Sequence, residues 1–149
     1  MPLCRLIYIS ENQLNRSDGS VVKQLSSILE ASNRNNKAVG LTGALVFDDM
    51  WFLQALEGER SDVWRTFKRI GRDERHSEVA VVEMVEVKER HFGNWWMGLA
   101  QRGPDTEAFF APYVSNGLLK AERMSAEDIL SLMTQLAKRG LNRGLAAAA

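Results

Sequence analysis

A glutamine surrounded by apolar side chains is the first feature of this sequence that points to chemistry. The stretch from Gly40 to Gly58, GLTGALVFDDMWFLQALEG, contains two short apolar runs separated by an Asp-Asp-Met turn, which predicts a β-hairpin. Because side chains alternate along a strand, Gln54 shares one face of the second run with Phe52 and Leu56. Leaving that amide unpaired would cost about 1–3 kcal/mol, so either the protein or a ligand must satisfy its hydrogen bonds.

Tyr8 is the second candidate for chemistry. Residues 4–10, CRLIYIS, predict a first strand on which Leu6 and Tyr8 share a face. A rotated or tautomerised amide changes which of its atoms donates a hydrogen bond, whereas a carboxylate only accepts one, so Gln54 has the properties of a switch. Taken singly, however, Tyr8 is also explained as a half-buried strand tyrosine, and Gln54 as an amide bonded to the neighbouring backbone.

Two amphipathic helices are predicted on either side of the hairpin in sequence. The first has apolar and small side chains at helical spacing, namely Leu25, Ile28, Leu29 and Ser32. The cluster at 33–36, Asn-Arg-Asn-Asn, is predicted to end this helix before Gly40, because asparagine tolerates left-handed geometry and caps helix ends. Ser61 and Asp62 are expected to cap the second helix, whose buried stripe consists of Val63, Phe67 and Ile70.

Arg69 and Asp73 are four residues apart and are predicted to lie together beside that stripe. Such a pair is usually a solvated ion pair that contributes a few tenths of a kcal/mol. At the rim of a pocket, the same two side chains could instead hold a polar ligand.

The remaining elements complete a predicted fold. Residues 78–87 alternate and predict a fourth strand, and the aromatic-rich stretch 95–101 predicts a fifth strand at an edge of the sheet. Beyond Pro104, an amphipathic helix is predicted to begin at Ser125 and to bury Ile129, Leu132, Met133 and Leu136. The order β-α-β-β-α-β with a fifth strand predicts an α+β, ferredoxin-like fold, with two helices on one sheet face and the C-terminal helical extension on the other.

Composition excludes several classes of protein. The 149 residues, 45% of them hydrophobic, fit one globular domain. Nineteen basic residues balance nineteen acidic ones, so no global charge favours nucleic acid or a membrane surface as a partner. One cysteine cannot form an internal disulfide, and two histidines are too few for a zinc cluster. Without a signal-peptide pattern or a bilayer-length apolar run, a cytoplasmic protein is expected.

Five short motifs in this order resemble those of the BLUF domain, a flavin-based blue-light sensor. They are Tyr8, the Arg34-Asn35-Asn36 run ahead of GLTG at 40–43, FLQALEG around Gln54, Asp73-Glu74-Arg75-His76, and Trp95 with Met97. The likeness covers residues 3–101, and the C-terminal helices resemble the extension of short, stand-alone bacterial members. The resemblance implies a sensor domain at 1–103, a helical extension at 104–140 and a disordered tail at 141–149.

The resemblance also implies a site. A flavin, FAD or FMN, would be held non-covalently between the two helices, with Tyr8 and Gln54 as the photoactive pair. The excited flavin would take an electron from Tyr8, a proton would follow, and recombination would leave Gln54 differently bonded and the flavin oxidised. Asn36 would bind the carbonyl edge of the flavin. The other flavin-binding residues would be Ile28, Ser32, Asn35, Phe52, Gln54, Arg69, Asp73 and His76, and the signalling residues Trp95 and Met97.

By this resemblance the protein is a photoreceptor rather than an enzyme, and its signal passes through the fifth strand and the C-terminal helices. We expect a homo-oligomer and a downstream protein such as a response-regulator-like protein, a transcriptional regulator or a separate EAL-type cyclic-di-GMP phosphodiesterase. A flavin-dependent oxidoreductase and a ligand-free interaction module are the alternatives. The sequence contains neither a Gly-x-Gly-x-x-Gly fingerprint nor a Walker loop, which an enzyme with a nucleotide site would usually need.

Overall fold

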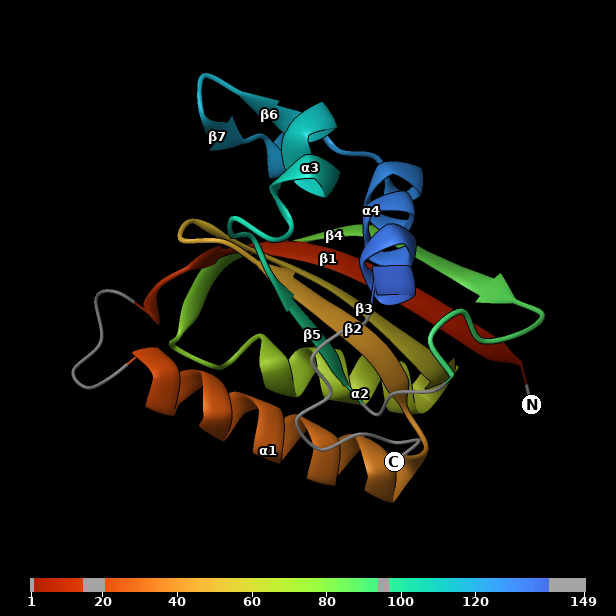
Figure 1. Cartoon of the computed structure of the whole chain (residues 1–149). Coiled ribbons are helices and arrows are strands. Elements are labelled where there is room, and N and C mark those ends of the chain that lie inside the picture. Colours follow the sequence, from red (N-terminus) through yellow and green to blue (C-terminus); the bar gives the residue numbers. More distant parts are fainter. Residues whose placement is uncertain (1, 15–20, 94–96, 140–149) are drawn as a thin grey trace.

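The computed structural model describes residues 2–14, 21–93 and 97–139 of the chain (Figure 1). Trp95 and the tail at 141–149 lie outside these ranges. Within them, no helix is both long enough and apolar enough to cross a membrane. The helices and strands, in chain order, are β1 (Leu3–Asn12), α1 (Val21–Val39), β2 (Thr42–Phe47), β3 (Trp51–Glu59), α2 (Arg60–Ile70), β4 (His76–Val87), β5 (Gly98–Gln101), α3 (Glu107–Phe110), β6 (Val114–Ser115), β7 (Leu118–Leu119) and α4 (Ala126–Arg139).

One five-stranded sheet forms the centre of the molecule, in the order β4-β1-β3-β2-β5. The first four strands are antiparallel and have the ferredoxin-like connection, while β5 adds in parallel to β2. The predicted hairpin is present, since β2 and β3 pair in antiparallel register. In its turn, the Asp48 carboxylate accepts hydrogen bonds from the backbone N–H groups of Met50 and Trp51, both at 2.8 Å. The predicted fold is therefore confirmed, including the edge position of the fifth strand.

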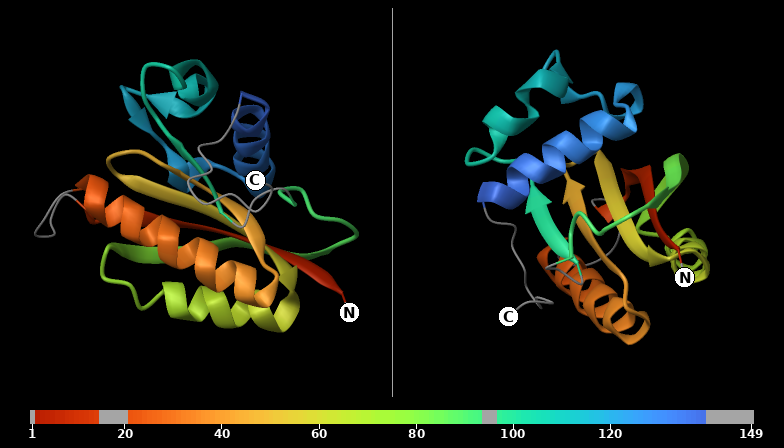
Figure 2. Two further views of the ribbon diagram at one scale, coloured as in Figure 1. Left: turned by 60° about the horizontal axis from the view of Figure 1, so that its bottom comes forward. Right: turned by 90° about the vertical axis from the view of Figure 1, so that its right-hand side faces the viewer.

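The two faces of the sheet are covered by different helices (Figures 1 and 2). On one face, α1 and α2 pack on a cluster that includes Leu6, Tyr8 and Leu56. On the other, α4 covers a cluster that includes Ile7 and Leu53. This division follows from the period-two alternation of β1 and β3. All four α4 side chains predicted to be buried are 2% exposed or less: Ile129, Leu132, Met133 and Leu136.

Two predictions of helix ends are wrong. Helix α1 continues through the asparagine cluster to Val39 and ends before Gly40, which has φ +73°. Asparagine is only mildly unfavourable inside a helix, and glycine adopts this left-handed conformation at much lower cost. Helix α2 begins at Arg60, with Glu59 at its N-cap and no side-chain cap hydrogen bond. Because β3 runs into α2 without a loop, Ser61 and Asp62 lie inside the first turn.

Gly43 lies where β2 and β3 approach each other too closely for a side chain. A Cβ atom there would clash with the backbone carbonyl of Ala55. We expect Gly43→Ala to lower the free energy of unfolding by about 1–3 kcal/mol, because the backbone cannot move away cheaply. Urea denaturation measures this. Gly103→Ala is the control, since a Cβ at Gly103 has nothing within 4 Å; equal stability of the two variants would contradict the argument.

Candidate functional site

A cavity of about 240 Å³ lies between α1 and α2, against the face of the sheet that these helices cover. Its floor comes from β1, β2 and β3, and its end from the turn between α2 and β4. The cavity collects side chains from six separate segments of the chain, which only the folded structure brings together. They are Tyr8, Ile28, Ala31, Ser32, Asn35, Asn36, Leu45, Phe52, Gln54, Thr66, Arg69, Ile70, Asp73, Arg75 and His76.

Helix α1 supplies one wall of the cavity. Ile28, Ser32 and Asn35 follow one another at intervals of four and three residues, so they form one row along the helix. Asn36 lies next to this row and is 2% exposed. Because α1 does not stop at the asparagines, their side chains are held on a rigid helix, and the amides of Asn35 and Asn36 face the same space as Ile28.

Tyr8 and Gln54 meet at the floor of the cavity. The antiparallel register of β1 and β3 places the two residues opposite each other, and both side chains are 3% exposed. The Tyr8 hydroxyl donates a hydrogen bond to Gln54 Oε1, and Gln54 Nε2 donates one to Met97 Sδ at 3.4 Å. The amide predicted to need a partner is therefore satisfied from both ends.

The environment keeps Tyr8 protonated. Burial, and then the negative charge of Asp73, raises the pKa of Tyr8 well above its ordinary value. The Phe67 ring lies 5.4 Å from the Tyr8 ring between centroids, and the His76 ring lies 6.1 Å away. Tyr8 is thus a neutral phenol enclosed by rings, with its hydroxyl proton directed at Gln54.

His76 connects the end of α2 to β1. Its Nδ1 lies 2.7 Å from Ser10 Oγ, and its Nε2 lies 2.8 Å from the Ile70 carbonyl oxygen. A carbonyl only accepts, so Nε2 carries a proton and donates it; in the neutral ring, Nδ1 then accepts from the Ser10 hydroxyl. His76 therefore holds the far end of the cavity in place, in addition to lining it.

Arg69 and Asp73 do not form the ion pair considered from the sequence. The spacing of four residues brings two side chains together only within a helix, and α2 ends at Ile70, so Asp73 lies in the following turn. Asp73 is bound instead by Arg75, whose backbone N–H and Nε donate to Asp73 Oδ1 at 2.9 and 2.8 Å. Burial opposes ionisation of Asp73, but the hydrogen bonds and charge of Arg75 outweigh it and lower the pKa of Asp73. Both Arg69 and Asp73 nevertheless line the cavity.

Tyr8 and all nine residues predicted to bind flavin line this one cavity. Met97 is not among the lining residues, but its Sδ accepts the hydrogen bond from Gln54 Nε2. Trp95 lies outside the described residues. Five lining residues were not predicted as site residues: Ala31, Leu45, Thr66, Ile70 and Arg75. Leu45 pairs with Gln54 across the hairpin, and Thr66 precedes Arg69 by one helical turn, so these two could have been found from the predicted elements.

A cavity flanked by two helices, with polar side chains on its floor and walls, is typical of a ligand-binding domain, here on a ferredoxin-like fold. The model of the BLUF family, described as "Sensors of blue-light using FAD", matches residues 3–98. This chain belongs to the BLUF family and is a flavin-binding blue-light sensor. The prediction made from the motifs is therefore confirmed for family, fold and general function.

Known proteins resemble the chain over two different extents. The photoactivated adenylate cyclase subunit beta of Euglena gracilis is 33% identical over 96 residues, which are 63% of this chain and 10% of that protein. The ground-state structure of BlsA has a TM-score of 0.83 and 26% identity, covering 96% of this chain and 93% of that one. The dark-state structure of the BLUF protein BlrB has a TM-score of 0.75 and 26% identity, covering 91% and 97%. The chain thus spans about a tenth of that cyclase subunit but nearly all of BlsA and BlrB.

The Asp73–Arg75 pair predicts a pH dependence of stability. The folded-state pKa of Asp73 lies below its ordinary value of 3.8, so the ionised carboxylate stabilises the folded state above pH 3.8. This contribution is lost as the pH falls through the lower folded-state value. We expect Asp73→Asn to lose less stability than the unmodified protein on acidification through this range, measured by thermal unfolding. Asp105→Asn, which removes an exposed carboxylate, should follow the unmodified protein; a flattened profile in this control would contradict the assignment.

Proposed function

We propose that this chain is a non-enzymatic photoreceptor that binds FAD in the cavity between α1 and α2 and uses Tyr8 and Gln54 as its photoactive pair. The observation that carries the proposal is the buried hydrogen bond from the Tyr8 hydroxyl to Gln54 Oε1. The Tyr8 hydroxyl is the donor and the Gln54 carbonyl oxygen the acceptor of this bond. Because both belong to side chains, the hydrogen bond can rearrange without movement of the backbone.

The cavity residues fit a flavin in chemical type. An isoalloxazine edge has hydrogen-bond acceptors and a donor, which amides such as Asn36 and Gln54 match because they offer both. Ile28, Leu45 and Phe52 supply apolar surface for a flat ring system. Arg69, on the side of α2 that lines the cavity, would hold the negatively charged phosphate of the cofactor. We propose FAD as the flavin because the description of the family names it.

Bound flavin, when excited by blue light, supplies an electron acceptor. Tyr8 would give up an electron, and its hydroxyl proton would pass along the existing hydrogen bond to Gln54 Oε1. The Gln54 amide would then be free to rotate or tautomerise, because its only other described partner, Met97 Sδ, is a weak acceptor. Return of the electron and proton to Tyr8 leaves no net oxidation and a Gln54 amide with a changed hydrogen-bond pattern.

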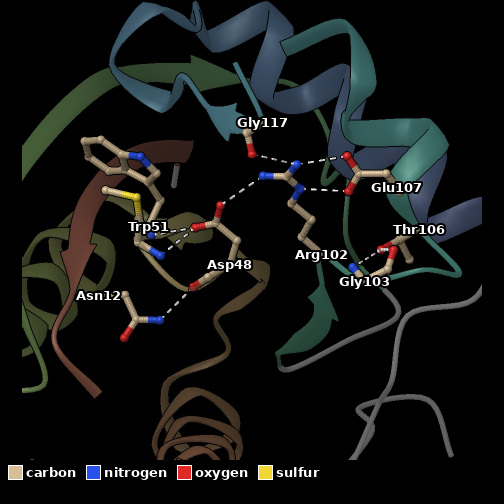
Figure 3. A network of polar contacts seen from close by, with 9 residues as sticks. Asn12, Asp48, Trp51, Arg102, Gly103, Thr106, Glu107 and Gly117 are labelled. Carbon is tan, nitrogen blue, oxygen red and sulfur yellow. Dashed lines mark hydrogen bonds and ion pairs between the residues drawn. The ribbon is translucent and has the colours of Figure 1, made fainter. Parts of the chain in front are cut away.

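The output would leave through β5. Met97 immediately precedes β5, and Arg102 immediately follows it. Arg102 forms an ion pair with Asp48 of the β2–β3 turn at 3.6 Å and donates to both carboxylate oxygens of Glu107 in α3 at 2.8 and 2.9 Å (Figure 3). A shift of β5 would therefore reach the region of 104–139, which would present the signal to a separate protein. A response-regulator-like protein or an EAL-type phosphodiesterase remains our proposed partner.

The proposal is tested by reconstituting the purified protein with FAD and, separately, with FMN, and recording spectra before and after blue light. We expect tighter binding of FAD, a small reversible shift of the flavin absorption to longer wavelength, and recovery in darkness. A flavin-loaded protein whose spectrum does not move would rule out the photoreceptor assignment of Tyr8 and Gln54.

Replacing Gln54 with Leu should retain flavin but abolish the spectral shift. A neutral hydrogen bond contributes only about 0.5–1.5 kcal/mol, so the amide is expected to act as a switch rather than as the main anchor. Tyr8→Phe should behave in the same way, because phenylalanine has no phenolic proton. Gln101→Leu, at the exposed end of β5, is the control and should keep a normal photocycle. A normal photocycle in Gln54→Leu would refute the role of the amide.

A further inference from the structure

A groove of about 490 Å³ lies where the β2–β3 turn, the end of β5, α3 and the β6–β7 hairpin meet. It shares no lining residue with the cavity between α1 and α2. We call it the Arg102 groove, because the Arg102 guanidinium joins its walls (Figure 3). Its lining residues are Asp48, Asp49, Met50, Arg102, Gly103, Pro104, Glu107, Gly117 and Leu118.

Two large apolar side chains are exposed in this groove. Met50 is 50% exposed and Leu118 is 44% exposed, although they come from the β2–β3 turn and from β7. Single exposed apolar residues are ordinary on a protein surface, but two that line one groove form a common apolar site. Methionine adapts its shape to a bound side chain, which suits such a site to a protein partner.

The backbone holds both of these side chains in place. The Asn12 backbone N–H donates a hydrogen bond to the Met50 carbonyl oxygen at 2.8 Å, which fixes the β2–β3 turn to β1. Leu118 follows the two-residue turn of the β6–β7 hairpin, in which Asn116 and Gly117 have φ +55° and +78°. Two successive left-handed residues are the conformation that a tight hairpin turn favours. The groove is therefore formed before a partner binds, so little ordering opposes binding.

The groove is negatively charged. Among the described residues that line it, the carboxylates of Asp48, Asp49 and Glu107 outnumber the guanidinium of Arg102. Hydrogen bonds from Arg102 lower the pKa of Glu107, so this carboxylate stays ionised at neutral pH. Asp49 is exposed and, in the part of the chain that the structure describes, takes part in no ion pair. The net charge of the whole chain is zero, so this negative charge is local.

We propose that the Arg102 groove is the docking site of the output protein, which inserts an apolar side chain flanked by lysine or arginine. The apolar side chain packs against Met50 and Leu118, and the basic side chain lies beside Asp49, so that both apolar surface and charge are complementary. A second copy of this chain is a poor occupant, because a two-fold contact would place two negative grooves against each other. This inference rests on the proposed function, since it names the chemistry of the partner that receives the signal.

Arg102 connects the groove to the proposed output through β5. Its backbone N–H donates to the Phe47 carbonyl oxygen at 2.9 Å, which fixes Arg102 to the end of β2. Its side chain contacts Asp48 on one wall and Glu107 and the Gly117 carbonyl oxygen on the other. A shift of β5 that carries Arg102 with it would therefore move the walls relative to each other and change the fit of a bound side chain.

Selection of short random peptides displayed on phage, against the full-length, flavin-loaded protein in darkness, tests the apolar part of the groove. We expect the selected peptides to carry lysine or arginine next to a large apolar residue. Measured by fluorescence anisotropy with the synthetic peptides, Leu118→Ser should raise the dissociation constant at least about tenfold. Val81→Ser is the matched control and should leave it unchanged, because Val81 is 47% exposed on β4, at the opposite edge of the sheet from β5. No selected peptides, acidic peptides, or equal weakening by both variants overturns the proposal.

A charge reversal tests the acidic part of the groove with the same peptides. Asp49→Lys should raise the dissociation constant about threefold or more, because it places a cation beside the basic side chain of the peptide. Glu86→Lys, the same change at an exposed position on β4, is the control and should have little effect. Flavin spectra verify that each variant is folded. If both reversals weaken binding equally, only the net charge matters and the groove is not the site.

Gln54→Leu separates this inference from the proposed photochemistry. Because Gln54 does not line the groove, this variant should bind the peptides in darkness as tightly as the unmodified protein. A missing spectral shift in the unmodified protein would refute the photochemistry and leave the groove intact, whereas peptides that bind the groove variants normally would refute the groove alone. Sedimentation velocity tests the remaining occupant, since a dimer that Leu118→Ser dissociates would assign the groove to a second copy and overturn the proposal.

Discussion

The functional site depends on one constraint, the register of β1 against β3, because it places Tyr8 opposite Gln54 and allows their buried hydrogen bond. Both polar groups are buried, so each needs the other, and they meet only because β1 and β3 pair in one register. A shift of one residue would turn either side chain to the α4 face, among Ile7 and Leu53. The apolar residues on the two faces fix the register of the strands, and the register in turn holds Tyr8 and Gln54 within hydrogen-bond distance.

The two layers of helices have different tasks. Helix α4 closes its face of the sheet with a continuous apolar cluster, which contributes stability in the ordinary way. Helices α1 and α2 leave a cavity whose wall contains asparagine, arginine and aspartate side chains. Polar groups at core positions lower stability, and proteins accept this at sites that bind ligands. A flavin-binding site, which the BLUF family assignment implies, accounts for the polar side chains that line this cavity.

Residues that hold the cavity together also connect it to the remainder of the chain. His76 joins β1 to the end of α2, and Arg75 fixes Asp73 in the turn that follows. Met97 lies between Gln54 and β5, and Arg102 connects the other end of β5 to the hairpin turn and to α3. Gln54 thus contacts Tyr8 and Met97 directly, although both residues are far from it in the sequence.

The sequence by itself determined the fold class and the central pair. The sequence shows period-two alternation around Tyr8 and Gln54 and helical spacing from Leu25 to Ser32. Both patterns depend only on neighbouring residues, so they can be recognised from the sequence alone. Tertiary structure alone decided that Asp73 pairs with Arg75 rather than Arg69, and that α1 continues to Val39. Each of these depends on where a helix stops or on which strand lies alongside, and such choices are settled by packing between distant segments, not by local propensity.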